Sequence, residues 1–290
     1  MILSFEITAD HIGIVSRDGG VSTVISELAL GRGSMQDGYI SDMENVFKRL
    51  ANELSDRNVK ARQCEFLLPA SFALTRELTL PKVSDAKLMP LISAQIEQSL
   101  PDIKNYVLDY IEFASDAADK RTLLAVLLPV RLVEQYLNLA SRLELKCTGI
   151  DLRFAKLRRT VRKLVNDRAF IVVDLLPGEA EVSLFEEDKV FVKSRELTER
   201  DNTLADWGIT FASAGPDSAE QADMLAGIIN SLIQFQTSRN RDIPVENIYA
   251  VGLTQRYKEM LGLCATVLNR SITGLTVENQ ALDTGVAAEG

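Results

Sequence analysis

An apolar strand that ends at an acidic residue and then folds back twice is the feature that most constrains this chain. Residues 170 to 191 read FIVVDLLPGEAEVSLFEEDKVF. The apolar run reaches Asp174, a Pro-Gly pair forms the turn, and an apolar/polar alternation returns into a second hairpin. The stretch therefore predicts antiparallel strands, the first of which ends at a carboxylate.

The first 26 residues predict a separate set of three short antiparallel strands. The segments ILSFEIT, HIGIVSR and GVSTVISEL alternate between apolar and polar residues, and the turn-forming clusters AD and DGG separate them. A helix is expected over 41 to 54, where Ser41 or Asp42 can cap its start, and a buried strand over 64 to 70. The N-terminal part is thus expected to be an α/β unit.

The pattern changes from about residue 80 to residue 150. It predicts helix, strand, strand, helix and strand, and the first helix begins after Ser84 and ends before Pro101. This segment is expected to form a small α+β subdomain with apolar faces of its own.

A strongly basic helix is predicted over 151 to 168. It carries seven Lys and Arg residues. We expect a solvated face whose arginines, among them Arg158, Arg159 and Arg162, are dispensable for folding. Contact of this face with acidic lipid headgroups or an acidic partner is the alternative.

The second half of the chain is predicted to continue with further α/β elements. The expected order after the hairpins is a mostly irregular segment over 196 to 220, a helix over 218 to 238, a strand over 246 to 253, a helix over 254 to 263, a short strand near 274 to 279 and a disordered end over 281 to 290.

Composition excludes several classes of protein. At 290 residues and 46% hydrophobic, the chain can form two lobes, and a net charge of −9 disfavours binding to nucleic acid. Cys64, Cys147 and Cys264 are predicted to be buried free thiols, and His11 to be a turn residue, so no metal site is expected. No apolar run long enough to span a membrane and no export signal is found, which predicts a soluble protein.

The segment LPASFALTRELTLPKVSDAKLMPLISAQIEQSLPDIKNYVLDY, residues 68 to 110, carries a family resemblance. It resembles the PilM family of type IV pilus assembly, with its relatives in the MSHA pilus (MshI) and in type II secretion (the cytoplasmic domain of GspL). Residues 38 to 50 and 246 to 253 add weaker matches. The resemblance implies an actin-like (ribonuclease H-like) two-lobed α/β fold. It divides the chain into a first lobe over 1 to 69, an inserted α+β subdomain over 70 to 150, and a linker helix with a reduced second lobe over 151 to 290.

The same resemblance implies a nucleotide site between the lobes, with glycine-containing hairpins that hold phosphate and acidic residues that hold Mg²⁺. In the first hairpin this chain has Glu6 where the family has Asp, Thr8 where it has Gly, and Gly13 where it often has Lys. The first phosphate-binding motif is therefore predicted to be lost.

The other two nucleotide motifs are also incomplete. Asp174 is kept, but Leu176 stands at the glycine of the second hairpin. Gly252 is kept at the adenosine turn, but Leu253 replaces its second glycine. Only about twenty residues are available for a further subdomain that lines the adenine pocket in the family. We therefore expect no catalytic residue, no bound metal and no cofactor.

The resemblance implies an adapter that binds the cytoplasmic tail of a bitopic PilN-type inner-membrane protein and couples it to the pilus assembly ATPase. The protein would be cytoplasmic and held at the inner membrane by that partner; whether it forms a homodimer stays open. The tail would lie in the groove between the first lobe and the insertion, near Leu78, Leu80, Pro81, Ile92 and Ile96. Ordinary core packing is the alternative for these five residues.

Two other functions are left open by the sequence. One is an ATP-binding or ATP-hydrolysing protein of the actin type, with Glu6 and Asp174 positioning Mg²⁺. The other is a GspL-like component of type II secretion.

Overall fold

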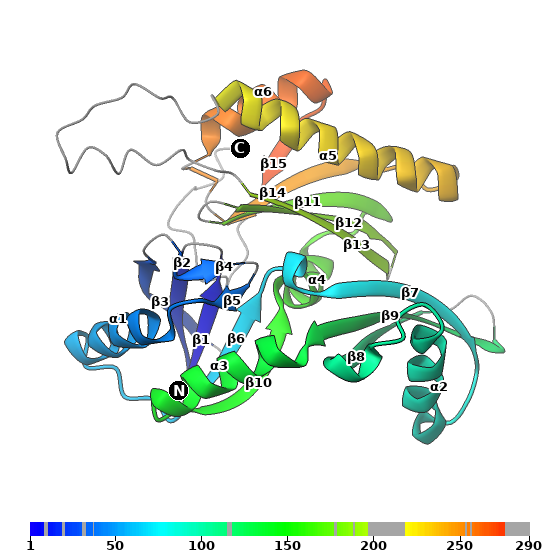
Figure 1. Ribbon diagram of the computed structural model, residues 1–290. Helices are drawn as coiled ribbons and strands as arrows, with labels where there is room; N and C mark the ends of the chain where they lie inside the picture. The colour runs from blue at the N-terminus through cyan, green and yellow to red at the C-terminus, as the bar shows by residue number, and fades with distance from the viewer. Residues whose placement is uncertain are drawn as a thin grey trace.

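The computed structural model describes residues 1–8, 11–18, 21–30, 33–36, 38–114, 118–176, 179–187, 189–196, 218–252, 254–255 and 257–275. The predictions for the Pro177-Gly178 turn, for Leu253, for the segment 197 to 217 and for the C-terminal end lie outside these residues. Figure 1 shows two large sheets, one above the other, and a third sheet that extends sideways from the lower one. A small hairpin of β4 (Met35–Gln36) and β5 (Tyr39–Ile40) lies beside the lower sheet.

The first large sheet has the strand order β10-β6-β1-β2-β3. Its strands are β1 (Ile2–Ile7), β2 (His11–Asp18), β3 (Val21–Ala29), β6 (Gln63–Leu68) and β10 (Lys146–Leu152). The first three pair antiparallel, as predicted, and β6 and β10 continue the sheet in parallel. Helix α1 (Met43–Asp56) begins after Asp42, whose carboxylate accepts a hydrogen bond from the Asn45 amide at 3.0 Å, which confirms the predicted cap.

The second large sheet has the order β13-β12-β11-β14-β15. Its strands are β11 (Ala169–Leu176), β12 (Glu179–Glu186), β13 (Lys189–Glu196), β14 (Asn247–Gly252) and β15 (Ile272–Gly274). Three antiparallel strands are again followed by two parallel ones. The hairpins predicted from residues 170 to 191 are confirmed, and the two sheets repeat one topology.

Two helices cover the outer face of the second sheet (Figure 1). Helix α5 (Ser218–Arg239) agrees with the prediction. Helix α6 (Lys258–Leu268) begins and ends later than the predicted range of 254 to 263. Tyr257 is at its N-cap position, and Asn269, in the left-handed conformation, ends it. Strand β15 ends where the predicted last strand began.

The insertion is shorter than the predicted range of 70 to 150. Its sheet has the order β7-β9-β8 and consists of β7 (Leu74–Pro81), β8 (Tyr106–Phe113) and β9 (Lys120–Pro129), with the predicted helix α2 (Asp85–Glu97) packed against it. Helix α3 (Val130–Arg142) and β10, which were predicted to belong to the insertion, return to the first sheet. Tyr136 and Leu139 of α3 are fully buried in the first core, and β10 pairs with β6.

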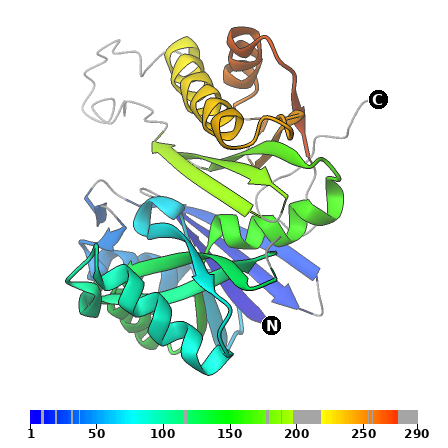
Figure 2. The ribbon, with the colours of Figure 1, turned by 90° about the vertical axis from the view of Figure 1, so that its right-hand side faces the viewer.

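Helix α4 (Arg153–Leu164) lies between the two large sheets, as the side view in Figure 2 shows. It is shorter than the predicted helix over 151 to 168, because the chain is still in β10 at Leu152 and is extended again at Val165. Its buried Phe154 and Leu157 join one hydrophobic core with Phe66 of the first sheet and Phe170 of the second. A separate core lies between the second sheet and helices α5 and α6. No helix in the described ranges is long and apolar enough to cross a membrane.

Candidate functional site

A buried arginine joins the two large sheets. Arg153, the first residue of α4, is 6% exposed and lies between Glu6 of β1 and Asp174 of β11. Its Nη1 donates to Glu6 Oε2 at 2.7 Å, its Nε to Asp174 Oδ2 at 3.1 Å, and its Nη2 to Asp174 Oδ1 at 3.2 Å. One side-chain cation therefore connects a carboxylate from each sheet.

Two further buried carboxylates hold the turn that leads into the insertion. Glu179 and Glu181 of β12 are both buried. The Glu181 carboxylate accepts a hydrogen bond from the Ala70 amide at 2.7 Å, and the Glu179 carboxylate accepts one from the Ser71 hydroxyl at 3.3 Å. Both donors lie in the short 3-10 helix η1 (Ala70–Phe72). These contacts connect the second sheet to the chain that leaves β6.

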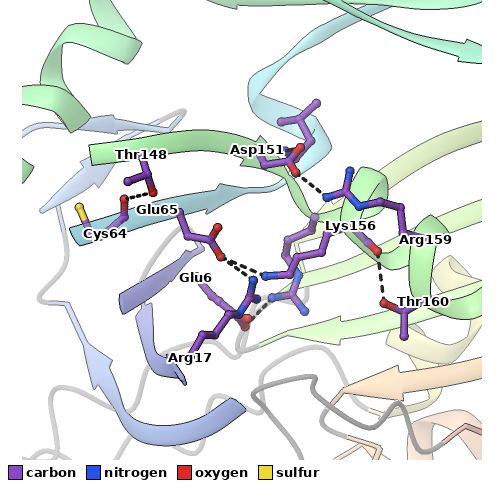
Figure 3. Close-up of polar contacts among 11 residues, drawn as sticks. Glu6, Arg17, Cys64, Glu65, Thr148, Asp151, Lys156, Arg159 and Thr160 are labelled. Carbon is purple, nitrogen blue, oxygen red and sulfur yellow. Dashed lines mark hydrogen bonds and ion pairs between the residues drawn. The ribbon is translucent and has the colours of Figure 1, made fainter. Parts of the chain in front are cut away.

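Glu65 of β6 fixes α4 on the first sheet. Arg17 approaches its Oε1 at 2.6 Å and Lys156 of α4 approaches the same atom at 3.2 Å. Figure 3 shows both basic side chains converging on Glu65, with Glu6 beside them. The start of α4 is thus held by ion pairs at two positions, at Arg153 and at Lys156.

Burial dominates the electrostatics of this region. It raises the pKa of Asp174, and the guanidinium of Arg153 opposes that rise. Burial also raises the pKa of Glu181, to about 8, against the effect of the hydrogen bond from Ala70. For Arg153, burial acts to lower the pKa, but Asp174 and Glu6 together raise it above its ordinary value, so the guanidinium stays charged.

The first predicted phosphate hairpin uses its backbone donors internally. The Thr8 amide donates to the His11 carbonyl at 3.0 Å, and the His11 amide donates to the Thr8 hydroxyl at 3.0 Å. His11 was predicted to be a turn residue; in the structure it is the first residue of β2. Gly13 pairs with Glu6 across the two strands. Neither of these two amide groups is directed toward a ligand.

The second hairpin and the adenosine turn are likewise part of the packed structure. Leu176 is fully buried, and its carbonyl accepts a hydrogen bond from the Tyr257 hydroxyl at 3.2 Å. Gly252 has a φ of +78°, and a Cβ there would overlap the carbonyl oxygen of Leu175. Glycine is required at this position by the close approach of β14 to β11.

The residues between the sheets do not fit a Mg²⁺-bound nucleotide. Mg²⁺ needs carboxylate oxygens that are free to coordinate it, whereas Glu6 and Asp174 are both engaged by Arg153. Across the described ranges, no group of three His, Cys, Asp or Glu side chains is placed to hold a metal ion.

For four of the five predicted partner residues, the structure supports the alternative of ordinary core packing. Leu78, Leu80, Ile92 and Ile96 are 7%, 4%, 0% and 2% exposed and form the core of the insertion with β9. The insertion sheet needs its own apolar face against α2, and these side chains supply it. Only Pro81 is exposed.

A groove nevertheless lies between the first lobe and the insertion. It has a volume of about 380 Å³ and is formed by β8, the end of β9, the outer face of α3, β10 and the start of α4. Its apolar lining includes Val107, Ile111, Val126, Leu137 and Ile150. Val107 and Leu137 are 45% and 46% exposed, so this apolar surface is accessible to a ligand.

Two strand edges border this groove. β8 is the outer strand of the insertion sheet, and β10 is the outer strand of the first large sheet. Within the described part of the chain, each pairs with a neighbour on one side only. An open strand edge offers backbone donors and acceptors to an extended peptide. Asp109 of β8 adds an exposed carboxylate to the lining.

Sequence reasoning located Glu6 and Asp174 but missed Arg153, Glu179 and Glu181. Arg153 stands in a run of basic residues that reads as a solvated face, and it is 147 and 21 residues away from its two partners along the chain. The Glu-Ala-Glu start of β12 carried a usable signal, because the strand that it begins is buried along its whole length. Two carboxylates in such a strand need internal partners.

No protein-family model matches the sequence, and no curated protein matches it. Among solved structures, a chain of the PilM-PilN type IV pilus biogenesis complex matches with a TM-score of 0.76 at 16% identity, over 97% of this chain and 90% of that chain.

Two further structures match over nearly the whole chain. A Bacteroides thetaiotaomicron protein of unknown function with an actin-like ATPase fold has a TM-score of 0.52 at 9% identity and covers 96% of this chain and 92% of its own. The ethanolamine utilization protein EutJ from Carboxydothermus hydrogenoformans has a TM-score of 0.51 at 9% identity, over 95% of this chain and 85% of its own. Together with the repeated sheet topology, these matches show that the chain has the actin-like ATPase fold, in the form found in the PilM-PilN complex.

Proposed function

We propose that this chain is a non-catalytic adapter of type IV pilus assembly, of the MSHA-like kind. In this proposal it binds the cytoplasmic tail of a PilN-type inner-membrane protein in the groove between β8 and β10, and it couples that protein to the assembly ATPase. The protein would be cytoplasmic and held at the inner membrane by its partner. The observation that carries the proposal is the accessible apolar groove between two open strand edges.

The chemistry of the groove suits an extended peptide. Strand edges supply main-chain hydrogen bonds, and the apolar lining supplies pockets for side chains on alternate sides of a strand. Val107 on β8 and Leu137 on α3 offer such apolar contacts from two different elements.

The charge of the chain suits a tail on the cytoplasmic side of a membrane. Such segments carry an excess of Lys and Arg, and this chain has a net charge of −9. Asp109, exposed in the groove lining, is a carboxylate that a basic residue of the tail can contact. A short basic and apolar peptide is therefore the expected ligand.

The rival function, an ATP-binding actin-like ATPase, would need Glu6 and Asp174 to release Arg153. The buried guanidinium of Arg153 would then be left without carboxylate partners, and an uncompensated buried charge costs about 3–5 kcal/mol. That cost, and the internal hydrogen bonds of Thr8 and His11, support an adapter without nucleotide chemistry.

The proposal is tested with fluorescent peptides that correspond to the cytoplasmic tails of single-span membrane proteins encoded near this chain. One tail is expected to bind with a micromolar dissociation constant. Val107→Asp and Leu137→Asp, on two walls of the groove, should each weaken binding by about tenfold or more, since each replaces an apolar contact worth about 1.5 kcal/mol or more.

Val267→Asp is the matched control, because Val267 is a 53% exposed apolar residue of α6, remote from the groove lining. It should bind the tail like the unchanged protein. Equal affinities of the groove variants and the unchanged protein would exclude this groove as the binding site.

A further inference from the structure

Two cysteines that are far apart in the sequence are neighbours in the first sheet. Cys64 of β6 and Cys147 of β10 are directly paired in the register of these parallel strands. The Cys64 side chain is buried in the first hydrophobic core, and the partly exposed Cys147 packs against the same core. The two side chains therefore lie on the same face of the sheet.

The geometry of adjacent strands suits a bond between these two thiols. Neighbouring strands are about 4.8 Å apart, and disulfide-bonded cysteines have Cα atoms about 4.4–6.8 Å apart. The strand is irregular at this point, with a register shift between Cys147 and Gly149. The Thr148 hydroxyl of this bulge donates to the Cys64 carbonyl at 2.9 Å, as Figure 3 shows, which keeps the backbone of the two strands in place.

The two thiols differ in access and in chemistry. Cys147 belongs to the lining of the groove, whereas Cys64 lies behind it. A hydrogen bond from Cys64 lowers the pKa of Cys147 to about 7, although burial opposes it, and the same contact raises the pKa of Cys64. Cys147 is thus suited to react first, as a thiolate. Cys64 is placed to follow because it is the register partner of Cys147 on the neighbouring strand.

We propose that Cys147 and Cys64 form a redox-active dithiol at the wall of the groove, with Cys147 as the reactive residue and Cys64 as the resolving one. The oxidant is a hydroperoxide. The Cys147 thiolate attacks the peroxide oxygen, the O–O bond breaks, and Cys147 sulfenic acid and hydroxide form. The Cys64 sulfur then attacks the Cys147 sulfur, and the S–O bond breaks with loss of water. Overall, two thiols and hydrogen peroxide give one disulfide and two waters.

The test uses the full chain and hydrogen peroxide, followed by peptide mapping with mass spectrometry. The unchanged protein is expected to lose two hydrogen atoms and to yield a peptide that links Cys64 to Cys147. Cys264→Ser is the matched control and should give the same link, because Cys264 is a buried thiol of α6 whose pKa burial raises to about 12. Cys147→Ser should give no link.

A second variant separates the two roles. In Cys64→Ala the sulfenic acid at Cys147 has no resolving thiol, so dimedone should label Cys147 after peroxide treatment. Iodoacetamide at pH 7 should alkylate Cys147 at least about tenfold faster than Cys264 in the folded protein. Absence of the link in folded, peroxide-treated protein, or a missing dimedone label in Cys64→Ala, would overturn the proposal.

A consequence for binding rests on the proposed function. A disulfide, or a bulky adduct on Cys147, changes the groove wall, so the oxidised protein should bind the tail peptide several-fold more weakly, and dithiothreitol should restore binding. If no peptide binds to the reduced protein, the proposed function fails but the disulfide chemistry can still be observed. If the peptide binds and no disulfide forms, the dithiol is disproved and the adapter stands.

Discussion

At the scale of single residues, Arg153 is the side chain on which the interface between the sheets depends. Its guanidinium contacts two carboxylates that are as buried as itself. Removing one partner from such a group leaves uncompensated charge in the interior, and that penalty is larger than the net stabilisation by the intact group. The effect of a substitution on the free energy of unfolding therefore depends on whether the charges are removed singly or together.

We expect Arg153→Met to lower the free energy of unfolding by about 3–5 kcal/mol, because Glu6 and Asp174 would be left buried without a cation. Urea denaturation measures this difference. The triple variant Glu6→Gln, Arg153→Met, Asp174→Asn should recover most of the loss, since no buried charge remains in the group.

Arg159→Met is the control for Arg153→Met. Arg159 forms an ion pair with Asp151 at 2.9 Å, but it is 61% exposed, and exposed pairs contribute about 0–1 kcal/mol. Equal destabilisation by Arg153→Met and Arg159→Met would contradict the structural role of Arg153.

Glu181 makes stability depend on pH. Its pKa is raised to about 8 in the folded protein, against about 4.3 in an unfolded chain. Between these values the folded state holds a proton that the unfolded state has lost, so this group's contribution to stability falls as pH rises from about 4 to about 8. Asp174, whose pKa is also raised, acts in the same direction.

Glu181→Gln should therefore be more stable than the unchanged protein at pH 8.5 and differ little from it at pH 4.5. Glutamine keeps an acceptor for the Ala70 amide and cannot ionise. Urea midpoints at the two pH values measure the effect. Glu187→Gln, at a half-exposed carboxylate near the end of β12, should leave the pH dependence unchanged; a wild-type pH profile in Glu181→Gln would contradict the assignment.

At the scale of elements, the arginines of α4 differ from their sequence-based prediction, and this difference changes the result expected from charge reversal. The sequence predicted a basic helix whose arginines are dispensable for folding. In the structure, the guanidinium of Arg162 lies 4.9 Å from the centre of the Phe170 ring, and that of Arg158 lies 5.4 Å from the centre of the Phe113 ring. Only Arg159 of the three is mainly exposed.

Single charge reversals should separate these arginines. Arg162→Glu is expected to lower the free energy of unfolding by about 2 kcal/mol, because it replaces a partly buried cation on aromatic rings with an anion. Arg159→Glu should change it by about 0.5–1 kcal/mol at most. Far-UV circular dichroism during urea denaturation measures both, and indistinguishable midpoints would restore the prediction of a dispensable basic face.

Local patterns predicted most elements but not how distant elements pair. The strands around Asp174 follow from the alternation of apolar and polar residues, and the cap of α1 follows from Asp42. Both are local signals. The pairing of β10 with β6 joins residues about eighty apart, and nothing local distinguishes it from pairing within the insertion. For the same reason, the sequence left open whether the apolar side chains of Leu78 and Ile92 line a groove or pack in the core of the insertion, where the structure places them.

At the scale of the whole molecule, the actin-like fold was predictable, but the buried charged group between its two large sheets was not. The missing glycines at Thr8 and Leu176 indicated that the nucleotide motifs had changed. The group that lies between the sheets depends on Arg153, whose helix α4 lies between them and whose side chain reaches both Glu6 and Asp174. A group whose three members come from three separate elements leaves no spacing pattern in the sequence.

We expect the whole protein to bind no nucleotide at useful affinity. Loss of several charge-assisted hydrogen bonds of about 1.5–3 kcal/mol each takes a micromolar affinity to the millimolar range or weaker. Calorimetric titration with Mg-ATP and Mg-ADP should show no saturable binding below about 1 mM, and Mg-ATP should not raise the melting temperature. A micromolar dissociation constant would restore the ATPase alternative, and Asp174→Ala would be the next variant to measure.

The position of Arg153 also affects how constant the arrangement of the two lobes is over time. A nucleotide dissociates or is hydrolysed, so a protein that depends on one to hold its lobes together passes through cycles and responds to the energy supply of the cell. The guanidinium of Arg153 is covalently part of the chain. It therefore cannot dissociate from the protein and is always present beside Glu6 and Asp174. We therefore expect the same arrangement of lobes in starved and growing cells.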